Sequence, residues 1–240
     1  MAELATASDS WERRIAATRA GLGAAAGLTA GDVELRVAAT VAQLGICARI
    51  LAPVLAAAVL DGAVLDASLA GLRWQPVLGG PFPLSVPDAA TRTLPTQELI
   101  STLRSELIDE TARALVTAVR HYSVSPVVAW GNVASALHGA GSTLSAHRPD
   151  LIETIQSVVR GLMSAPALAA AGGTTTSGSY RRRSCCLIYR VGGGRTAICG
   201  DCVLRRSDDG AQSADHQTSP ARQSQVSSPS RSSATAPGRT

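Results

Sequence analysis

Four of the five cysteines of this 240-residue chain lie close together near its C-terminus. They form two pairs, Cys185-Cys186 and Cys199-Gly200-Asp201-Cys202, with a glycine-rich stretch between them. Thiols gathered in this way, in a chain whose first residues show no signal peptide, are typical of a metal or iron–sulfur site in a reducing compartment. The fifth thiol, Cys47, lies alone in an apolar stretch, where we expect a small buried core residue. The sequence therefore predicts one sulfur-ligated centre, built by C-terminal residues.

The residues between the two pairs favour a β-hairpin. Residues 187–191 and 196–198 are β-prone, and Gly192-Gly193 suits a two-residue turn in which both positions need a positive φ. This register places Cys186 opposite Cys199 and leaves the other two cysteines just beyond the open end. We therefore expect one hairpin to bring all four sulfurs together.

Residue chemistry alone leaves three kinds of centre open. Zinc sites usually draw on two Cys-x2-4-Cys knuckles, and only the pair Cys199 and Cys202 has that form. The adjacent cysteines, Cys185 and Cys186, must project in different directions, which favours the wider two-iron cluster. A thiol–disulfide pair is the third alternative. A zinc site would suit a binding module that contacts nucleic acid, and an iron–sulfur cluster would suit a redox sensor or carrier.

The basic charge of the chain is concentrated on the cysteine segment. Residues 1–180 hold 12 Arg and 14 acidic residues, whereas residues 181–206 hold 7 Arg and one acidic residue, and the chain has no lysine. Such a segment suits nucleic acid, but it also suits compensation of an anionic cluster or attraction of an anionic partner. We assign this electrostatic role as a group to Arg181, Arg182, Arg183 and Arg190.

The run RRRSCCLIYR from Arg181 to Arg190, with CGDCVL from Cys199 to Leu204, closely resembles the C-terminal signature of the FhuF-like ferric-siderophore reductases. Proteins of that family carry a [2Fe–2S] cluster on a Cys-Cys-x10-Cys-x2-Cys motif. The segment from Trp130 to Ser135 is similar to the family's Trp-Gly-Asn segment, and the resemblance extends over about residues 10–204. The spacing between the pairs is x12 in this chain. Two extra residues lengthen each hairpin arm by one, so the pairing of the cysteines is preserved.

This resemblance implies an oxidoreductase that reduces siderophore-bound Fe(III) to Fe(II) by one-electron transfer and releases the iron in the cytoplasm. It implies a [2Fe–2S] cofactor held by Cys185, Cys186, Cys199 and Cys202. Trp130 and Asn132 are candidates for lining the substrate pocket. The expected partners are a ferric siderophore such as a hydroxamate and a protein electron donor such as a ferredoxin or flavin reductase, with no nucleic acid.

The rest of the chain predicts a mainly α-helical fold with one short hairpin. The hydrophobic periodicity and capping residues favour helices over about 11–19, 32–61 with a kink or restart at Pro53, 96–121, 126–137, 149–163 and 166–171. A β-hairpin is predicted from residues 72–77 and 84–86 around Gly79-Gly80-Pro81. The glycine- and threonine-rich residues 172–179 read as a linker.

These elements give three predicted regions. Residues 1–179 form a helical domain, residues 180–206 form the small cysteine-rich cluster module, and residues 207–240 form a disordered tail that is rich in Ser, Gln and Pro. The most apolar stretch, Val37 to Leu60, is interrupted by Gln43, Arg49 and Pro53. We therefore expect a buried helix there rather than a membrane span.

Overall fold

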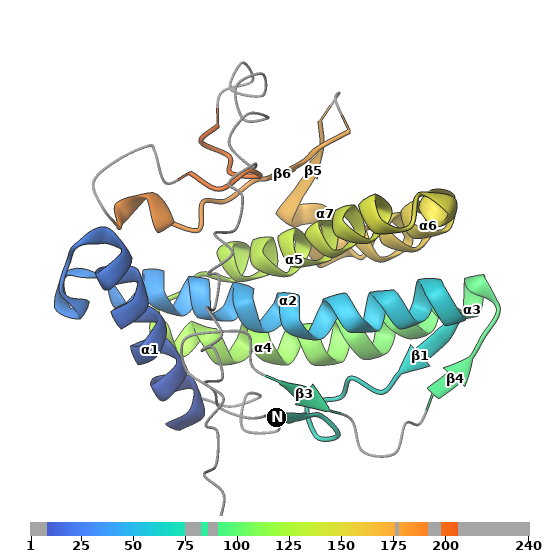
Figure 1. Cartoon of the computed structure of the whole chain (residues 1–240), viewed down its shortest axis with the longest axis horizontal. Helices are drawn as coiled ribbons and strands as arrows, with labels where there is room; N and C mark the ends of the chain where they lie inside the picture. The colour runs from blue at the N-terminus through green and yellow to red at the C-terminus, as the bar shows by residue number, and fades with distance from the viewer. Residues whose placement is uncertain (1–8, 75–82, 86–90, 176–177, 192–197, 206–240) are drawn as a thin grey trace, which may run out of the picture. The chain divides into compact units, whose positions relative to one another are not determined.

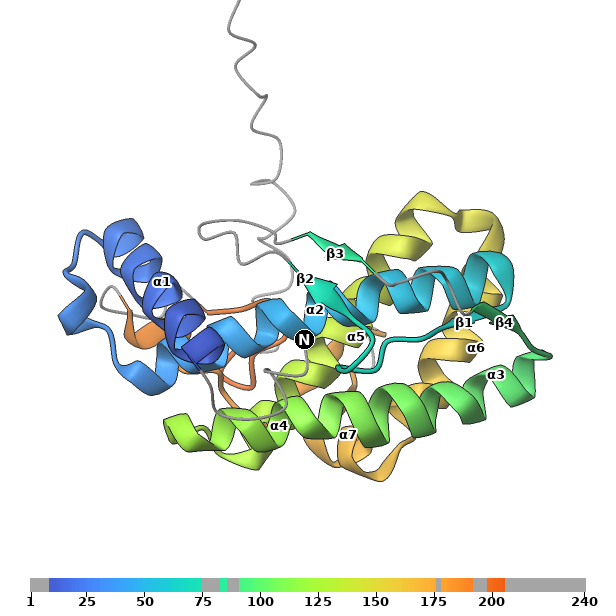
Figure 2. The ribbon, with the colours of Figure 1, turned by 90° about the horizontal axis from the view of Figure 1, so that it is seen from below.

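The computed structural model describes residues 9–74, 83–85, 91–175, 178–191 and 198–205. Most of these residues are helical, as the sequence predicts. The helices α2 (Leu35–Asp61) and α5 (Pro126–His147) run side by side (Figure 1), and the helix that continues from α3 (Thr96–Leu103) to α4 (Arg113–Val119) lies alongside them (Figure 2). The helix α1 (Asp9–Ala26) lies across the N-terminal end of α2. The strand β6 (Tyr180–Arg182) contacts α5 on the side away from α2 (Figure 1), and the turn η6 (Ile188–Arg190) contacts α2.

The first helix, α1 (Asp9–Ala26), is longer than predicted because its glycines do not end it. Gly23 is buried, and a Cβ atom there would lie 2.9 Å from the carbonyl oxygen of Thr29. The small residue therefore lets the chain fold back, and the amide of Leu28 bonds to the carbonyl of Gly23 at 2.8 Å. A short 3-10 helix, η2 (Ala30–Asp32), follows.

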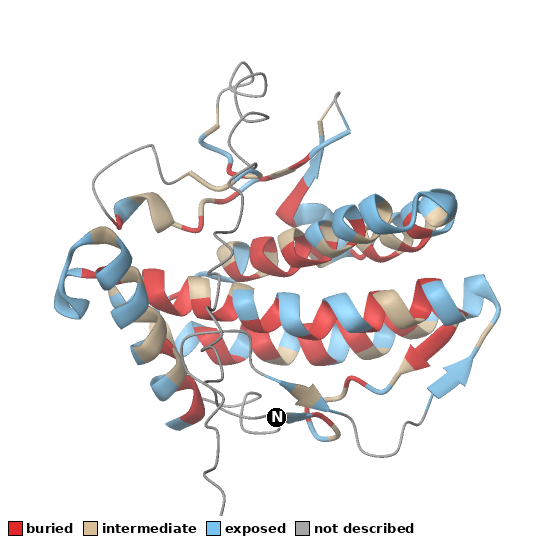
Figure 3. Cartoon of the chain, in the orientation of Figure 1, coloured by how far each residue is buried: buried red, intermediate tan, exposed pale blue. Residues whose placement is uncertain are grey.

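The central helix α2 (Leu35–Asp61) is continuous through Pro53 and ends at Gly62, whose φ of 61° is readily adopted only by glycine. It packs mainly on α5, and also on α1 and α4. In the described part of the chain it is the one helix whose length and apolar composition would suffice for a membrane crossing. Figure 3 shows that its buried positions are spread along its whole length, which is the pattern of a core helix.

The predicted helix over 96–121 is present in four consecutive segments. They are α3 (Thr96–Leu103), the π-helical η3 (Arg104–Ala112), α4 (Arg113–Val119) and the 3-10 turn η4 (Arg120–Tyr122). In the π-helical part the Thr111 hydroxyl donates a hydrogen bond to the carbonyl of Ala67, which ties this helix to the strand region.

The helix α5 (Pro126–His147) begins as predicted, because Ser125 accepts a hydrogen bond from the Val128 amide and Pro126 occupies the first turn. It continues ten residues beyond the predicted end at Leu137. The 3-10 turn η5 (Pro149–Leu151), α6 (Ile152–Met163) and α7 (Pro166–Ala171) agree with the predicted helices.

Three two-stranded antiparallel sheets are present in the described residues. β2 (Arg73–Trp74) pairs with β3 (Leu84–Ser85), which confirms the predicted hairpin, although its turn lies outside the described residues. β1 (Ala63–Leu65) pairs with β4 (Thr91–Thr93), a pairing that the sequence did not predict.

The third sheet corrects the prediction of a linker over residues 172–179. β5 (Gly172–Thr174) pairs with β6 (Tyr180–Arg182). The amide of Thr175 bonds to the carbonyl of Ser179 at 2.7 Å and closes the connection. β6 also contacts α5, so this hairpin joins the helices to the cysteine segment. The proposed division into domains at residue 179 stays a prediction, and the predicted tail lies outside the described residues.

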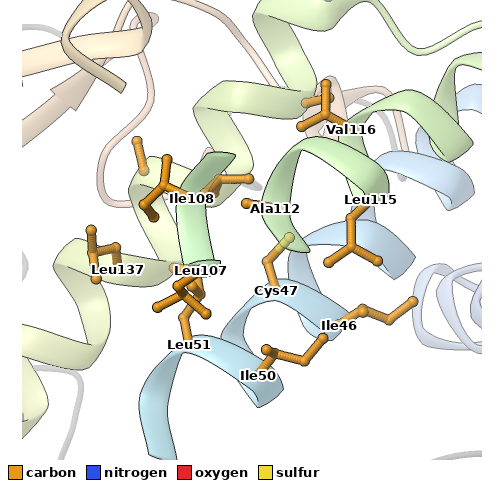
Figure 4. Close-up of a cluster of buried hydrophobic side chains, with 14 of the residues drawn as sticks. Ile46, Cys47, Ile50, Leu51, Leu107, Ile108, Ala112, Leu115, Val116 and Leu137 are labelled. Atoms are coloured by element: carbon orange, nitrogen blue, oxygen red, sulfur yellow. The ribbon is translucent and has the colours of Figure 1, made fainter. Parts of the chain in front are cut away.

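The core lies between α2, α4 and α5 and is built from Leu, Ile, Val and Ala side chains. Figure 4 shows the Cys47 thiol among Ile46, Leu107 and Leu115. Cys47 is 1% exposed, which confirms its assignment as a core residue, and burial raises its pKa to about 12.

Candidate metal centre

The four C-terminal sulfurs lie together as two pairs. The Sγ atoms of Cys186 and Cys199 are 2.9 Å apart, and those of Cys185 and Cys202 are 3.7 Å apart. All four cysteines are free thiols. The predicted placement of Cys186 opposite Cys199 is confirmed, and the two adjacent cysteines contribute to different pairs, as their divergent directions require.

The backbone that creates this placement is not the predicted strand. Leu187 adopts a φ of 67°, and Ile188–Arg190 form the 3-10 turn η6. The predicted strand over 187–191 is therefore wrong, and residues 192–197, which hold the predicted glycine turn, lie outside the described residues. The left-handed residue directs the Leu187 amide at Cys185 Sγ, at 3.3 Å. An amide bonded to sulfur explains why the chain turns here instead of extending.

The second pair lies on a tight turn that is held from both ends. The amide of Cys202 bonds to the carbonyl of Cys199 at 3.1 Å, and the amide of Leu204 donates to Cys202 Sγ at 3.4 Å. The Asp201 carbonyl accepts a hydrogen bond of 2.9 Å from the amide of Arg182 in β6. The Asp201 carboxylate contacts the hydroxyl of Ser135 in α5. The turn is thus fixed to both the hairpin and the helix.

Hydrogen bonds, burial and nearby charge shift the pKa values of three of the thiols. The hydrogen bond from Cys199, helped by the Ile188 amide and the charge of Arg182, lowers the pKa of Cys186 to about 6. The same hydrogen bond and burial raise the pKa of Cys199, and burial raises the pKa of Cys185 to about 11. A metal that needs thiolate ligands must therefore displace the protons of Cys185 and Cys199, whose pKa values are raised.

Arg182 is the one predicted arginine that lies deep inside the protein, at 1% exposure. Its Nη2 donates to Asn132 Oδ1 at 2.8 Å and to the Val128 carbonyl at 3.2 Å. Its Nε and Nη1 are buried and have no hydrogen-bond partner. A buried guanidinium is costly unless an anion compensates it, and the Cys186 thiol, whose pKa Arg182 helps to lower, supplies such an anion when it ionises.

Asn132 links this arginine to the core of the helical region. Its Nδ2 donates to Gln43 Oε1 at 2.6 Å and to the Thr40 carbonyl at 3.0 Å. Gln43 Nε2 in turn donates to the Ala129 carbonyl at 3.2 Å. Asn132 and Gln43 are both fully buried. The structure therefore places Asn132 in an internal polar chain that supports Arg182, and not on a surface where it would touch a substrate.

The face of α5 that carries Gly131 and Ser135 explains the Trp-Gly-Asn segment. A Cβ atom at Gly131 would lie 2.7 Å from Ser184 Oγ and 2.9 Å from Arg182 Nη2. Only glycine therefore allows the residues before the cysteines to cross α5 this closely. Ser184 also donates a hydrogen bond of 3.1 Å to the Val127 carbonyl.

The other predicted residues lie nearer the surface. Trp130 is half-buried, and its ring lies 5.6 Å from the guanidinium carbon of Arg113. Arg181 donates to the Arg205 carbonyl at 2.8 Å, and the exposed Arg183 donates to the Ala170 carbonyl at 3.3 Å. The exposed Arg190 forms an ion pair of 2.9 Å with Glu34. The four predicted arginines thus have different surroundings, and Arg182 alone joins the buried site.

Sequence reasoning missed Gln43, Ser135 and Ser184. A signal existed for Gln43, which is a polar residue inside an apolar helix, and for Ser135, which follows Asn132 by three positions and so shares its helix face. Ser184 carried no such signal.

These residues fit a two-iron cluster better than a single ion. The sulfurs group two and two, as the ligands of two irons do. Two amides donate to sulfur, and the unpaired atoms of Arg182 suit the negative charge of a thiolate-ligated cluster.

Comparison with known proteins agrees with this geometry. Residues 182–204 match the family model described as FhuF 2Fe-2S C-terminal domain. This match confirms the resemblance noted for the cysteine segment, and it identifies the cofactor as a [2Fe–2S] cluster. No curated protein and no solved structure matches the chain.

Proposed function

Because residues 182–204 belong to the FhuF 2Fe-2S C-terminal domain family, we propose that this protein reduces siderophore-bound Fe(III) to Fe(II). The observation that carries the proposal is the two-by-two arrangement of Cys185, Cys186, Cys199 and Cys202 within the matched segment. The match supports an iron–sulfur protein of the ferric-siderophore reductase type. We propose the cytoplasm as the compartment in which the iron is released.

The chemistry of release follows from the ligands of the iron. Siderophores hold Fe(III) through hard, anionic oxygens, and Fe(II) binds such oxygens more weakly because it carries less charge. One electron therefore releases the iron without hydrolysis of the siderophore. When bound, the [2Fe–2S] cluster supplies a one-electron carrier whose potential depends on charge, hydrogen bonds to sulfur and exposure.

The residues of this chain set those three properties. The Leu187 and Leu204 amides donate to sulfur, and Arg182 supplies a buried positive charge. The half-exposed sulfur positions, Cys185 and Cys199, lie on the solvent side of the site, whereas Cys186 and Cys202 are buried. This combination favours a stable but accessible centre that exchanges electrons with partners.

The electron donor is proposed to be another protein. Arg183 is exposed near the cysteines, and Val203 and Leu204 are exposed apolar side chains just after Cys202. Positive charge beside exposed apolar surface suits an acidic redox protein such as a ferredoxin. Weak docking of this kind is expected to decrease as salt is added.

An anaerobic reduction assay tests the proposed function. Freshly purified protein should be coloured, bleach with dithionite, and regain its visible absorption when a ferric hydroxamate is added, while an Fe(II) chelator traps one Fe(II) per electron. Cys186→Ser should lose both the absorption and the trapped Fe(II), whereas Cys47→Ser, at the buried core thiol, should keep both. If the reduced protein does not reoxidise and no Fe(II) is trapped, the reductase assignment fails and a redox carrier or sensor remains. Colourless protein with stoichiometric zinc would refute the cluster itself.

A further inference from the structure

A large pocket lies beside the cysteine site. Its volume is about 1020 Å³, at the upper end of the range of about 300–1,000 Å³ that small-molecule sites occupy. The helices α5 and α6, the end of α7 and the β5–β6 hairpin form its walls. The pocket is separate from the internal polar chain through Asn132, and none of the four cysteines lines it.

One wall of the pocket is the turn that carries two of the cysteines. Gly200 and Asp201 line the pocket, and each is covalently adjacent to a cysteine of the site. Consecutive Cα atoms are about 3.8 Å apart, so a ligand that touches this turn is separated from the sulfurs by little more than one residue. Because Asp201 is held by Ser135 and by the β6 backbone, the wall is fixed rather than loose.

The pocket has almost no net charge. Among the lining residues that the structure describes, Arg160 is the one cationic residue and Asp201 the one acidic residue. His138 stacks on Tyr180 with ring centroids 5.4 Å apart, and burial lowers its pKa, so it is neutral at pH 7. The remaining polar groups are hydroxyls and one amide, and Ile152 and Met163 add apolar surface.

We propose that this pocket is the binding site for the ferric complex, and that it accepts complexes of zero or single charge. The proposal rests on the function proposed above. Three hydroxamate groups, each with one negative charge, neutralise Fe(III), whereas three catecholates leave three negative charges. One arginine and one carboxylate among the described lining residues do not compensate a trianion in a partly apolar pocket.

The pocket lies close enough to the cysteines for an electron to pass to a complex bound in it. One electron crosses from the cysteine side of the Cys199–Cys202 turn to Fe(III), which becomes Fe(II). The electron is replaced by the external donor protein, or by dithionite in the assay. No bond of the protein forms or breaks, and the substrate does not need to reach the buried sulfurs.

Binding can be measured separately from reduction by using gallium. Ga(III) has the charge of Fe(III) but accepts no electron under these conditions, so its trihydroxamate complex is an inert probe for calorimetric titration of the cluster-loaded protein. Gln156→Trp, on an exposed position of α6, and Gly173→Trp, on β5, both place a large ring in the pocket. No atom lies within 4 Å of a Cβ at Gly173, so the second variant is not expected to disturb the hairpin. Thr154→Trp, on an exposed position of α6 away from the pocket, is the matched control.

We expect both pocket variants to bind the gallium trihydroxamate at least tenfold more weakly, with the visible absorption of the cluster unchanged, and the control to bind within twofold of the parent. A gallium tris-catecholate should bind the parent at least tenfold more weakly than the trihydroxamate. Unchanged binding in both pocket variants, or no binding to the parent, would overturn the location. Equal binding of the two complexes would overturn the charge preference. If gallium binding follows the pocket variants but the parent yields no Fe(II) from the ferric complex, the pocket stands and the reductase function fails.

Discussion

Replacing Arg182 with glutamine should make the reduction potential of the cluster more negative. The guanidinium is 1% exposed, its Nε and Nη1 lack partners, and its charge already favours the thiolate of Cys186. Reduction adds one negative charge beside this cation. Arg182→Gln removes the cation but keeps a side-chain amide that can donate to Asn132, so the internal polar chain is preserved.

The size of the effect follows from Coulomb's law. Two unit charges about 8 Å apart at an effective dielectric constant of about 20 interact by about 2 kcal/mol. For a one-electron couple, in which a tenfold change in equilibrium corresponds to about 59 mV, this energy is about 90 mV. We therefore expect the potential of Arg182→Gln to lie about 50–100 mV below that of the parent.

An anaerobic redox titration followed by visible absorption measures this shift. Arg183→Gln is the matched control, because it removes the same charge from the next residue at an exposed position. Its effect should be much smaller, and 0.5 M salt should remove it, whereas the shift in Arg182→Gln should persist in salt because the charge is buried. Equal shifts in the two variants, or no shift in Arg182→Gln with an intact spectrum, would refute the role of the buried cation.

Three further outcomes follow from the packing of α5, the docking of the cysteine turn and the buried thiol. Gly131→Ala should lower the free energy of unfolding by about 1–3 kcal/mol and reduce cluster content, because the added methyl group would lie under 3 Å from two C-terminal side chains. The control is Gly139→Ala, at a helical position where no atom lies within 4 Å of the added Cβ. This control should raise the free energy of unfolding by about 0.5–1 kcal/mol. Thermal unfolding and iron content measure both, and equal destabilisation would contradict the close approach. Ser135→Ala should speed cluster loss to a chelator, since it frees Asp201, and an unchanged rate would show that the turn does not depend on this contact. The neutral Cys47 thiol should stabilise the fold below pH 9, and this stabilisation should decline as the pH rises toward the folded pKa of about 12, because only the unfolded thiol ionises in that range. Urea unfolding at pH 8 and at pH 10 should show that the free energy of unfolding of the parent, relative to that of Cys47→Ala, falls by about 1.4 kcal/mol. A difference that stays constant between the two pH values would exclude the buried neutral thiol.

The helices could be predicted from the sequence because their signals are local. Ser125-Pro126 caps α5, and the apolar stripe from Leu99 to Val119 appears as a continuous buried helix. The errors arose where a distant contact decides the structure. Gly23 does not end α1, because the following loop packs against it. The residues 172–174 form a strand because β6 pairs with them, and no property of a glycine-rich segment predicts that partner.

The same division applies to the candidate site. Cysteine spacing was sufficient to predict the contact between Cys186 and Cys199, although the backbone that produces it is a 3-10 turn. The sequence could not separate Arg182 from its neighbours, since three consecutive arginines look alike until one of them meets Asn132 across α5. Alternation along β6 buries Tyr180 and Arg182 and leaves Arg181 nearer the surface, and this alternation exists only once β5 pairs with the strand.

The buried arginine also explains why the cysteine segment depends on helices that the family match does not include. Gln43 and Asn132 are fully buried polar residues in the two most closely packed helices, and such groups reduce stability unless all their hydrogen bonds are made. The Asn132 Oδ1 atom has its hydrogen bond only when Arg182 reaches it, and anionic sulfur beside Arg182 compensates the charge of the arginine. Each step therefore depends on the next, from α2 through α5 to the cysteines. Because an anionic cluster would compensate the arginine more fully than the Cys186 thiolate alone, we expect binding of the cluster and tight packing of β6 on α5 to stabilise one another.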